Sequence, residues 1–129
     1  MNLLLDTPAF LWLCAGAKQL SAGAVAAIGD PANLAAVSAA TAWEIGLKAA
    51  RGKLALPVPV KNWFPSMIEH HHLLLLPIDA STAIASTQLP AIHSDPFDRL
   101  LVATASERSL RLVTPDPFIA KYPNVLTLW

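Results

Sequence analysis

The chain has little charge and only one cysteine, and each shortage excludes a class of protein. Only 14% of its 129 residues are charged, and nine basic residues balance nine acidic ones. A net charge of zero argues against a generic basic nucleic-acid binder, so any contact with phosphate must be local or metal-mediated. The single cysteine, Cys14, cannot form an intrachain disulfide. We interpret it as a buried structural thiol, which fits a reducing, cytoplasmic compartment.

Long hydrophobic runs are also missing, although the chain is apolar as a whole. Hydrophobic residues make up 54% of the sequence, and the mean hydropathy is +0.47. No apolar run reaches the roughly 18 residues of a membrane span, and the start M-N-L-L-L-D lacks the basic region of a secretory signal. So apolar a composition predicts instead that part of the surface is covered by another chain, either a second copy or an obligate partner.

Short apolar runs alternate with helical patterns, and the length suits one domain over residues 1–129. Such brief runs are typical of buried strands in a parallel sheet. Strands are expected at 2–5, 34–37, 73–76, 110–113 and 125–128, and helices at 9–16, 22–29, 39–51, 60–72, about 80–89, 96–108 and 118–121. The pattern predicts an α/β fold, a three-layer sandwich with a central parallel sheet of about five strands.

The stretch H-S-D-P-F-D-R-L-L-V-A-T-A, residues 93–105, places two acids at the start of an apolar helix. Pro96 suits the first helical turn, and Asp95 before it is best interpreted as the N-cap. Asp98 lies near the third helical position, where an acid also favours the helix dipole. Because almost no charge follows, the helix is expected to be buried. A carboxylate carried into a core needs a basic residue or a metal ion as its partner.

Three more acids are expected near the same edge of the sheet. Asp6 and Asp116 each follow a predicted strand, and Glu44 lies about two turns into the helix after the second strand. Strand ends and the starts of the following helices share one edge of an open parallel sheet. Two simpler interpretations remain open: Asp6 can cap the next helix, and Glu44 can pair with Lys48 on a solvated helix face.

If Asp98 and the three acids Asp6, Glu44 and Asp116 converge, cations must lie among them. Without nearby positive charge, four neighbouring carboxylates cannot all stay ionised. A carboxylate-rich site without cysteine or paired histidine favours Mg²⁺ or Mn²⁺ over Zn²⁺. Such ions support phosphodiester hydrolysis by activating a water and neutralising the leaving oxygen. The adjacent histidines at 70–72 are not expected to ligate one ion, because consecutive helical residues point in different directions.

Four sequence blocks run in order across essentially the whole chain: L-L-L-D-T, S-A-A-T-A-W-E-I-G-L-K, H-S-D-P-F-D-R-L-L-V-A-T-A and L-V-T-P-D-P-F-I. Together they resemble the PIN-domain ribonucleases, and more narrowly the VapC-type toxins of bacterial toxin–antitoxin pairs. The resemblance implies an α/β/α sandwich and RNA cleavage that depends on Mg²⁺ or Mn²⁺. It also implies a cognate antitoxin that masks the site, and a homodimer or a higher assembly with that antitoxin.

By the same resemblance, the family's acids correspond to four positions that are expected to hold the metal and position the attacking water: Asp6, Glu44, Asp98 and Asp116. Supporting roles go to residues beside them, with Asp95 as a cap or near neighbour and Thr114 as a hydrogen-bonding hydroxyl. Two basic residues are expected to steady carboxylates or to meet RNA phosphate, namely Lys48 and Arg99.

Pro8 and Pro115 depart from the family pattern, since related sequences often carry His and Arg at these places. Neither change removes an acid, but the missing basic group beside Asp116 is expected to affect substrate choice. The hypothesis is a metal-dependent endoribonuclease toxin. One alternative is a catalytically silent PIN-like module that binds RNA or protein. A phosphoryl-receiving regulatory domain also uses acids at strand ends, but no lysine follows a late strand to support it.

Overall fold

The short apolar runs form the strands of one parallel sheet. In the computed structural model, which describes residues 1–129, the strands are β1 (Asn2–Leu5), β2 (Leu34–Ser38), β3 (Leu74–Leu76), β4 (Arg111–Val113) and β5 (Leu126–Leu128). Their order across the sheet is β3-β2-β1-β4-β5, and every neighbouring pair is parallel. The prediction of a five-stranded parallel sheet is confirmed.

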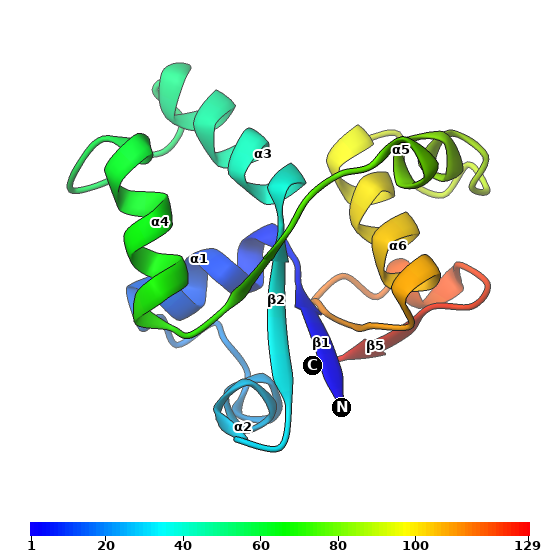
Figure 1. Ribbon diagram of the computed structural model, residues 1–129, viewed down its shortest axis with the longest axis horizontal. Helices are drawn as coiled ribbons and strands as arrows, with labels where there is room; N and C mark the ends of the chain where they lie inside the picture. Colours follow the sequence, from blue (N-terminus) through cyan, green and yellow to red (C-terminus); the bar gives the residue numbers. More distant parts are fainter.

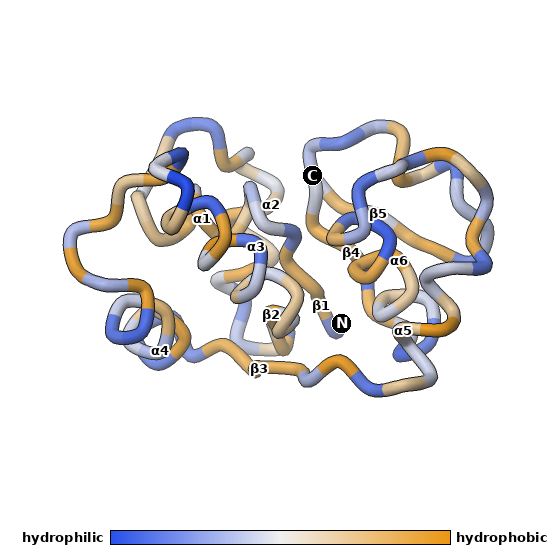
Figure 2. Tube along the Cα trace, turned by 90° about the horizontal axis from the view of Figure 1, so that it is seen from above, coloured by the Kyte–Doolittle hydropathy of each residue, from blue (hydrophilic) through white to orange (hydrophobic).

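Helices cover both faces of this sheet. They are α1 (Thr7–Ala15), α2 (Ala22–Gly29), α3 (Ala39–Ala50), α4 (Val60–His70), α5 (Ala80–Thr87) and α6 (Pro96–Arg108), with a short 3₁₀ helix η1 (Ile119–Lys121). Two perpendicular views place α1, α2 and α4 on one side of the strands, and α5 and α6 on the other (Figure 1, Figure 2). Helix α3 leaves the carboxyl end of β2 and contacts both α4 and α6. The predicted three-layer α/β/α arrangement is therefore confirmed.

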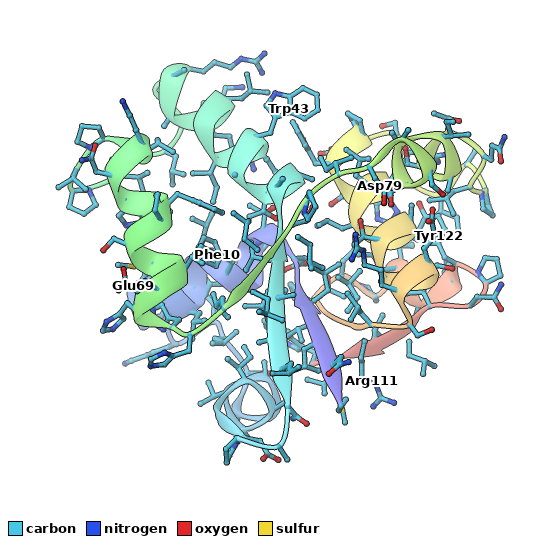
Figure 3. The ribbon with its side chains drawn as sticks, viewed as in Figure 1. Phe10, Trp43, Glu69, Asp79, Arg111 and Tyr122 are labelled. Atoms are coloured by element: carbon cyan, nitrogen blue, oxygen red, sulfur yellow. The ribbon has the colours of Figure 1, made fainter.

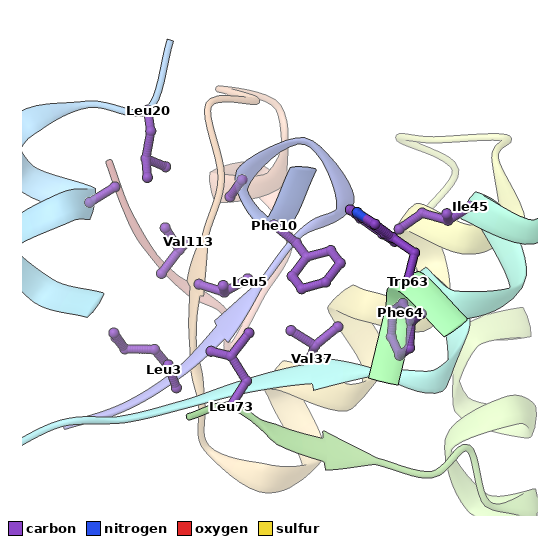
Figure 4. Packing of buried hydrophobic residues seen from close by; sticks show 13 residues of the cluster. Leu3, Leu5, Phe10, Leu20, Val37, Ile45, Trp63, Phe64, Leu73 and Val113 are labelled. Carbon is purple, nitrogen blue, oxygen red and sulfur yellow. The ribbon is translucent and has the colours of Figure 1, made fainter. Parts of the chain in front are cut away.

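Alternate strand residues fill two cores, one on each face of the sheet. Leu3 and Leu5 of β1 face the layer of α1, α2 and α4, whereas Leu4 between them faces α6. In the first core, Phe10 of α1 packs its ring against two rings of α4 (Figure 4), those of Trp63 and Phe64. Burial on both faces explains why the strands are uninterrupted apolar runs. A fully buried side chain of this size contributes about 1.5–3 kcal/mol to folding.

Side-chain caps fix where the helices begin. A side-chain oxygen accepts a hydrogen bond from a backbone N–H two or three residues on, at 2.8–3.0 Å, in each of Asp6, Ser21, Ser38, Asp79 and Asp95. Three of these caps begin α1, α3 and α6, the helices that carry or follow the predicted site acids. The cap interpretations of Asp6 and Asp95 are therefore correct. For Asp6, capping does not exclude a second role.

Cys14 differs in part from expectation, because its side chain is only partly buried. It lies in the last turn of α1, beyond the fully buried Ala9 and Phe10. Burial still raises the pKa of its thiol to about 12, so the thiol stays protonated and unreactive.

No helix in the chain is long and apolar enough to cross a lipid bilayer.

Candidate functional site

The four predicted acids come from four elements that meet at the carboxyl edge of the sheet. Asp6 directly follows β1, and Asp116 lies in the loop after β4. Asp98 is in the first turn of α6, and Glu44 is in the first half of α3. Helix α3 rises from the carboxyl end of β2 next to α6 (Figure 1), so Glu44 lies near the helix that carries Asp98 although it is about two turns into α3.

Electrostatic coupling shows that these acids lie in one neighbourhood. The charges of Asp95, Glu44 and Asp116 all raise the pKa of Asp98. The charges of Asp98 and Asp116 likewise raise the pKa of Asp6. A nearby like charge disfavours the ionised form of a carboxyl group, so these effects indicate that the acids lie near one another. The structure therefore brings the predicted acids together, with Asp98 coupled to all the others.

Burial is the largest cause of the shifts at the two central acids. Asp6 is only 4% exposed, and burial raises its pKa from 3.8 to about 6, although the Thr114 hydroxyl and the Ala9 amide lower it. Burial also raises the pKa of Asp98 to about 6, against an opposing effect of His93. Both carboxyl groups are thus difficult to ionise. The site lacks enough positive charge to compensate them.

Glu44 forms the ion pair with Lys48 that helical spacing predicts, but its carboxylate is buried rather than solvated. Its Oε2 atom lies 2.7 Å from Nζ of Lys48, so the i,i+4 ion pair forms, and Lys48 contacts a carboxylate as expected. Glu44 is only 9% exposed, whereas the side chain of Lys48 is 46% exposed, so only the carboxylate end of the pair is buried. The charge of Glu44 raises the pKa of Asp98, so this carboxylate also acts on the acid cluster.

The carboxylate of Asp116 is held by groups that the sequence analysis did not single out. Its Oδ2 atom lies 2.7 Å from Nε2 of His93, and its Oδ1 atom accepts the N–H of Phe118 at 2.9 Å. The hydroxyl of Thr114 accepts the backbone N–H of Asp116 at 3.1 Å. His93 opens the same H-S-D-P-F-D block as the acids. His93 could have been singled out from the sequence, because its titratable ring lies close to Asp95 and Asp98 in that block.

Arg99 steadies no carboxylate in the structure, contrary to one of its two predicted roles, and its predicted contact with RNA phosphate stays a prediction. Its guanidinium donates to four backbone carbonyls at 2.9–3.1 Å, those of Ser86, Leu89, Pro90 and His93. The segment between α5 and α6 is irregular, so its carbonyls lack hydrogen-bond donors from a helix or sheet. The planar guanidinium of Arg99, with its five N–H groups, supplies such donors. Arg99 therefore fixes the loop that precedes α6.

The chemistry of the acid cluster fits a hard divalent cation. Its donors are carboxylate oxygens with the Thr114 hydroxyl nearby, the ligand type that Mg²⁺ and Mn²⁺ prefer. Burial and neighbouring carboxylates raise the pKa of Asp6 and Asp98, and a cation would stabilise both groups in the ionised form. As placed, no three acidic or histidine side chains enclose a single ion position. Ligation by several of them at once therefore requires side-chain movement.

Comparisons with known proteins agree with the fold and the sequence blocks. The family model for the PIN domain matches residues 3–124. "Ribonuclease VapC22" of Mycobacterium tuberculosis is 35% identical over 132 residues, which cover 99% of this chain and 98% of that protein. The structure of VapBC2 from Rickettsia felis, bound to a promoter DNA fragment, aligns with a TM-score of 0.68 at 15% identity, covering 98% of this chain and 97% of that one. FitAcB from Neisseria gonorrhoeae aligns with a TM-score of 0.62 at 25% identity, covering 98% and 96%. The chain belongs to the PIN-domain family.

Proposed function

We propose that this chain is an endoribonuclease that cleaves RNA with the help of Mg²⁺ or Mn²⁺ and acts as the toxin of a toxin–antitoxin pair. The observation that carries the proposal is the coupled acid cluster, in which burial and neighbouring carboxylates raise the pKa of Asp6 and Asp98 to about 6. The 35% identity to a protein named as a VapC ribonuclease supports the choice of RNA as substrate.

Asp6 and Asp98 are the residues that would hold the principal ion, because they are the two central, most electrostatically strained acids of the cluster. A bound divalent ion supplies a water of lowered pKa and neutralises charge on the phosphate as the bond to the leaving oxygen breaks. Glu44 and Asp116 complete the negative cluster and orient the attacking water by accepting its hydrogen bonds. Lys48 holds Glu44 in place through the 2.7 Å ion pair.

The proposed partner is a cognate antitoxin, together with a second copy of the chain, in the cytoplasm. A structure that shares the fold, with a TM-score of 0.65, is a toxin–antitoxin complex from Klebsiella pneumoniae. Large apolar side chains stand about half exposed here, among them Leu74 and Leu75 on the edge strand β3 and Trp43 on α3. An exposed apolar edge strand invites pairing with another chain. This exposure supports the expectation from composition that another chain covers part of the surface.

The nuclease proposal is tested by RNA cleavage with and without divalent ions. Wild-type protein should cleave in Mg²⁺ or Mn²⁺ and stop when a chelator is added. Asp6→Asn should lose at least about a hundredfold in rate, since it removes a charge that would ligate the ion. Glu69→Gln is the matched control, because Glu69 is exposed on α4, away from α6 (Figure 3). RNA binding without cleavage would favour the silent binding module instead.

The toxin role needs a separate test in cells. Induced wild-type protein should arrest growth, whereas Asp6→Asn should not. Co-expression with the product of a small adjacent gene should restore growth and improve the solubility of the toxin. A protein that cleaves RNA in vitro but is harmless and soluble alone would contradict the toxin role and leave the nuclease chemistry standing.

A further inference from the structure

His93 links the loop before α6 to the loop after β4. Its Nε2 atom lies 2.7 Å from Oδ2 of Asp116, and the two side chains are 13% and 32% exposed. Asp116 stands between Pro115 and Pro117, which have no backbone N–H to offer. Its carboxylate therefore depends on only two protein donors, the N–H of Phe118 and the ring of His93. Of these, only His93 comes from a different part of the fold.

Tyr122 determines how the imidazole of His93 can donate. The Tyr122 hydroxyl accepts the backbone N–H of His93 at 3.0 Å and lies 2.8 Å from Nδ1 of the same residue. Because the hydroxyl already accepts from the backbone, its own proton is free to point at Nδ1. The neutral ring then carries its proton on Nε2 and donates it to Asp116. The alternative tautomer would set the Nε2 lone pair against a carboxylate.

The ring is also held mechanically. Tyr122, which is labelled in Figure 3, is 3% exposed and packs in the core under α6. Its ring stacks on that of His93 at 15° between planes and 5.5 Å between centroids. Arg99 of α6 donates to the carbonyl of His93 at 3.1 Å, so the backbone of His93 is fixed from a second side. A ring whose backbone and both nitrogens are all bonded has one orientation.

We propose that His93 is a positioning residue of the nuclease site, which orients the Asp116 carboxylate toward Asp6 and Asp98 by donating from Nε2, with Tyr122 fixing its tautomer. The inference rests on the proposed function. Asp116 is coupled to both central acids, so turning its carboxylate changes the charge that they experience. His93 does not itself touch the reacting phosphate in this assignment.

Two substitutions by amide side chains of different length separate positioning from simple packing. In His93→Gln the amide nitrogen reaches about as far as Nε2 and can donate to Asp116. In His93→Asn the shorter side chain ends near the place of Nδ1 and cannot. Loss of a neighbour that orients a metal ligand typically costs about 10–100-fold in metal affinity or activity. We expect that loss in His93→Asn, in Mn²⁺ affinity measured by calorimetry and in kcat for RNA cleavage, with KM little changed.

His93→Gln should recover Mn²⁺ affinity and kcat to within about threefold of wild type. A purely structural role predicts instead that both variants lose stability in urea alike, while Mn²⁺ affinity and kcat of the folded protein stay unchanged. Equal Mn²⁺ affinity and kcat in His93→Asn and wild type overturn the inference alone. A wild type that neither binds Mn²⁺ nor cleaves RNA overturns the proposed function itself.

The tautomer gives a readout that does not depend on nuclease activity. In the metal-free protein, at a pH where the His93 ring is neutral, its ¹⁵N shifts should show the proton on Nε2 and an accepting Nδ1. Tyr122→Phe removes the hydroxyl proton that Nδ1 accepts and should lower kcat, while the stacked aromatic ring stays in place. A neutral His93 with its proton on Nδ1 in the wild type contradicts the assignment.

Discussion

The Oδ1 atom of Asp6 accepts the backbone N–H of Ala9 at 2.8 Å, so the acid that follows β1 also caps α1. One buried carboxylate thus begins a helix and contributes charge to the acid cluster. The two roles have different chemical requirements. The cap needs only an acceptor oxygen, which asparagine also has, whereas the cluster needs the negative charge.

Asp6→Asn should therefore stabilise the metal-free protein near neutral pH. The folded pKa of about 6 lies above the ordinary 3.8, so the folded state of the wild type binds the extra proton, and stability falls as pH rises from about 4 through 6. Asparagine avoids this loss. The expected gain in the free energy of unfolding is up to about 3 kcal/mol by the conversion of one pKa unit to about 1.4 kcal/mol.

Urea denaturation at about pH 5 and pH 7.5 measures this gain, which should be larger at the higher pH. Asp30→Asn is the matched control, because Asp30 also accepts a backbone N–H but is exposed, and it should show no gain. A metal-free Asp6→Asn protein that is less stable than wild type at the higher pH would contradict the strained cluster.

Asp95 should act mainly as the N-cap of α6, and its charge should also raise the pKa of Asp98. Asp95→Ala removes the acceptor for the N–H of Phe97, which lies 2.8 Å from Oδ1, and should cost about 1 kcal/mol of stability. Asp95→Asn keeps the acceptor and should cost less. Both changes remove a charge that raises the pKa of Asp98, so that pKa should fall in both variants when followed by carboxyl ¹³C NMR. If Asp95→Asn abolishes cleavage as thoroughly as Asp98→Asn, Asp95 belongs among the metal-holding acids.

Arg99→Lys should be costly although it conserves charge. A lysine cannot reach four carbonyls with the geometry of a guanidinium, so the loop before α6 loses partners, and we expect a loss of about 2 kcal/mol. Arg108→Lys on the same helix is the control, since Arg108 is exposed and only 3.9 Å from Asp79. The two free energies of unfolding are compared in urea. Equal losses would show that the carbonyl contacts of Arg99 contribute little.

The positions of the acids were predictable because their surroundings are local. Each of Asp6 and Asp116 follows a run too short and too apolar for anything but a buried strand, and Pro96 marks the start of the helix that carries Asp98. The layered fold follows from the same alternation of short runs and helices. Even the caps at Ser21 and Ser38 lie where the residue types favour them.

The contacts of the loops were not predictable, because they are made by residues distant in sequence. His93 meets Asp116 across 23 positions and Tyr122 across 29. No spacing rule connects such residues. The bonds from Arg99 to backbone carbonyls likewise depend on how the loop before α6 folds. Glu44 shows the same limit: its pair with Lys48 follows from helical spacing, but the burial of Glu44 itself follows from the packing of α3 against α6 and α4.

Mn²⁺ affinity should depend on pH in a window set by the two central acids. Protons compete with the ion for Asp6 and Asp98, and both pKa values are about 6. The dissociation constant for Mn²⁺ should therefore rise on the order of tenfold when the pH falls from about 7.5 to about 5.5. Carboxylates with ordinary pKa values would be ionised at both pH values. Calorimetric titrations that give the same constant at both would contradict the assignment of these two acids.

The central claim is that four acids from four elements share one divalent ion, and Mn²⁺ titration of single variants tests it most directly. Calorimetry on Asp6→Asn, Glu44→Gln, Asp98→Asn and Asp116→Asn, with Glu69→Gln as the exposed control, gives the affinity of each for Mn²⁺. We predict one site in the wild type, an unchanged affinity in the control, and a weaker affinity in every acid variant, most of all in Asp6→Asn and Asp98→Asn. Wild-type affinity in all four acid variants would contradict the shared site.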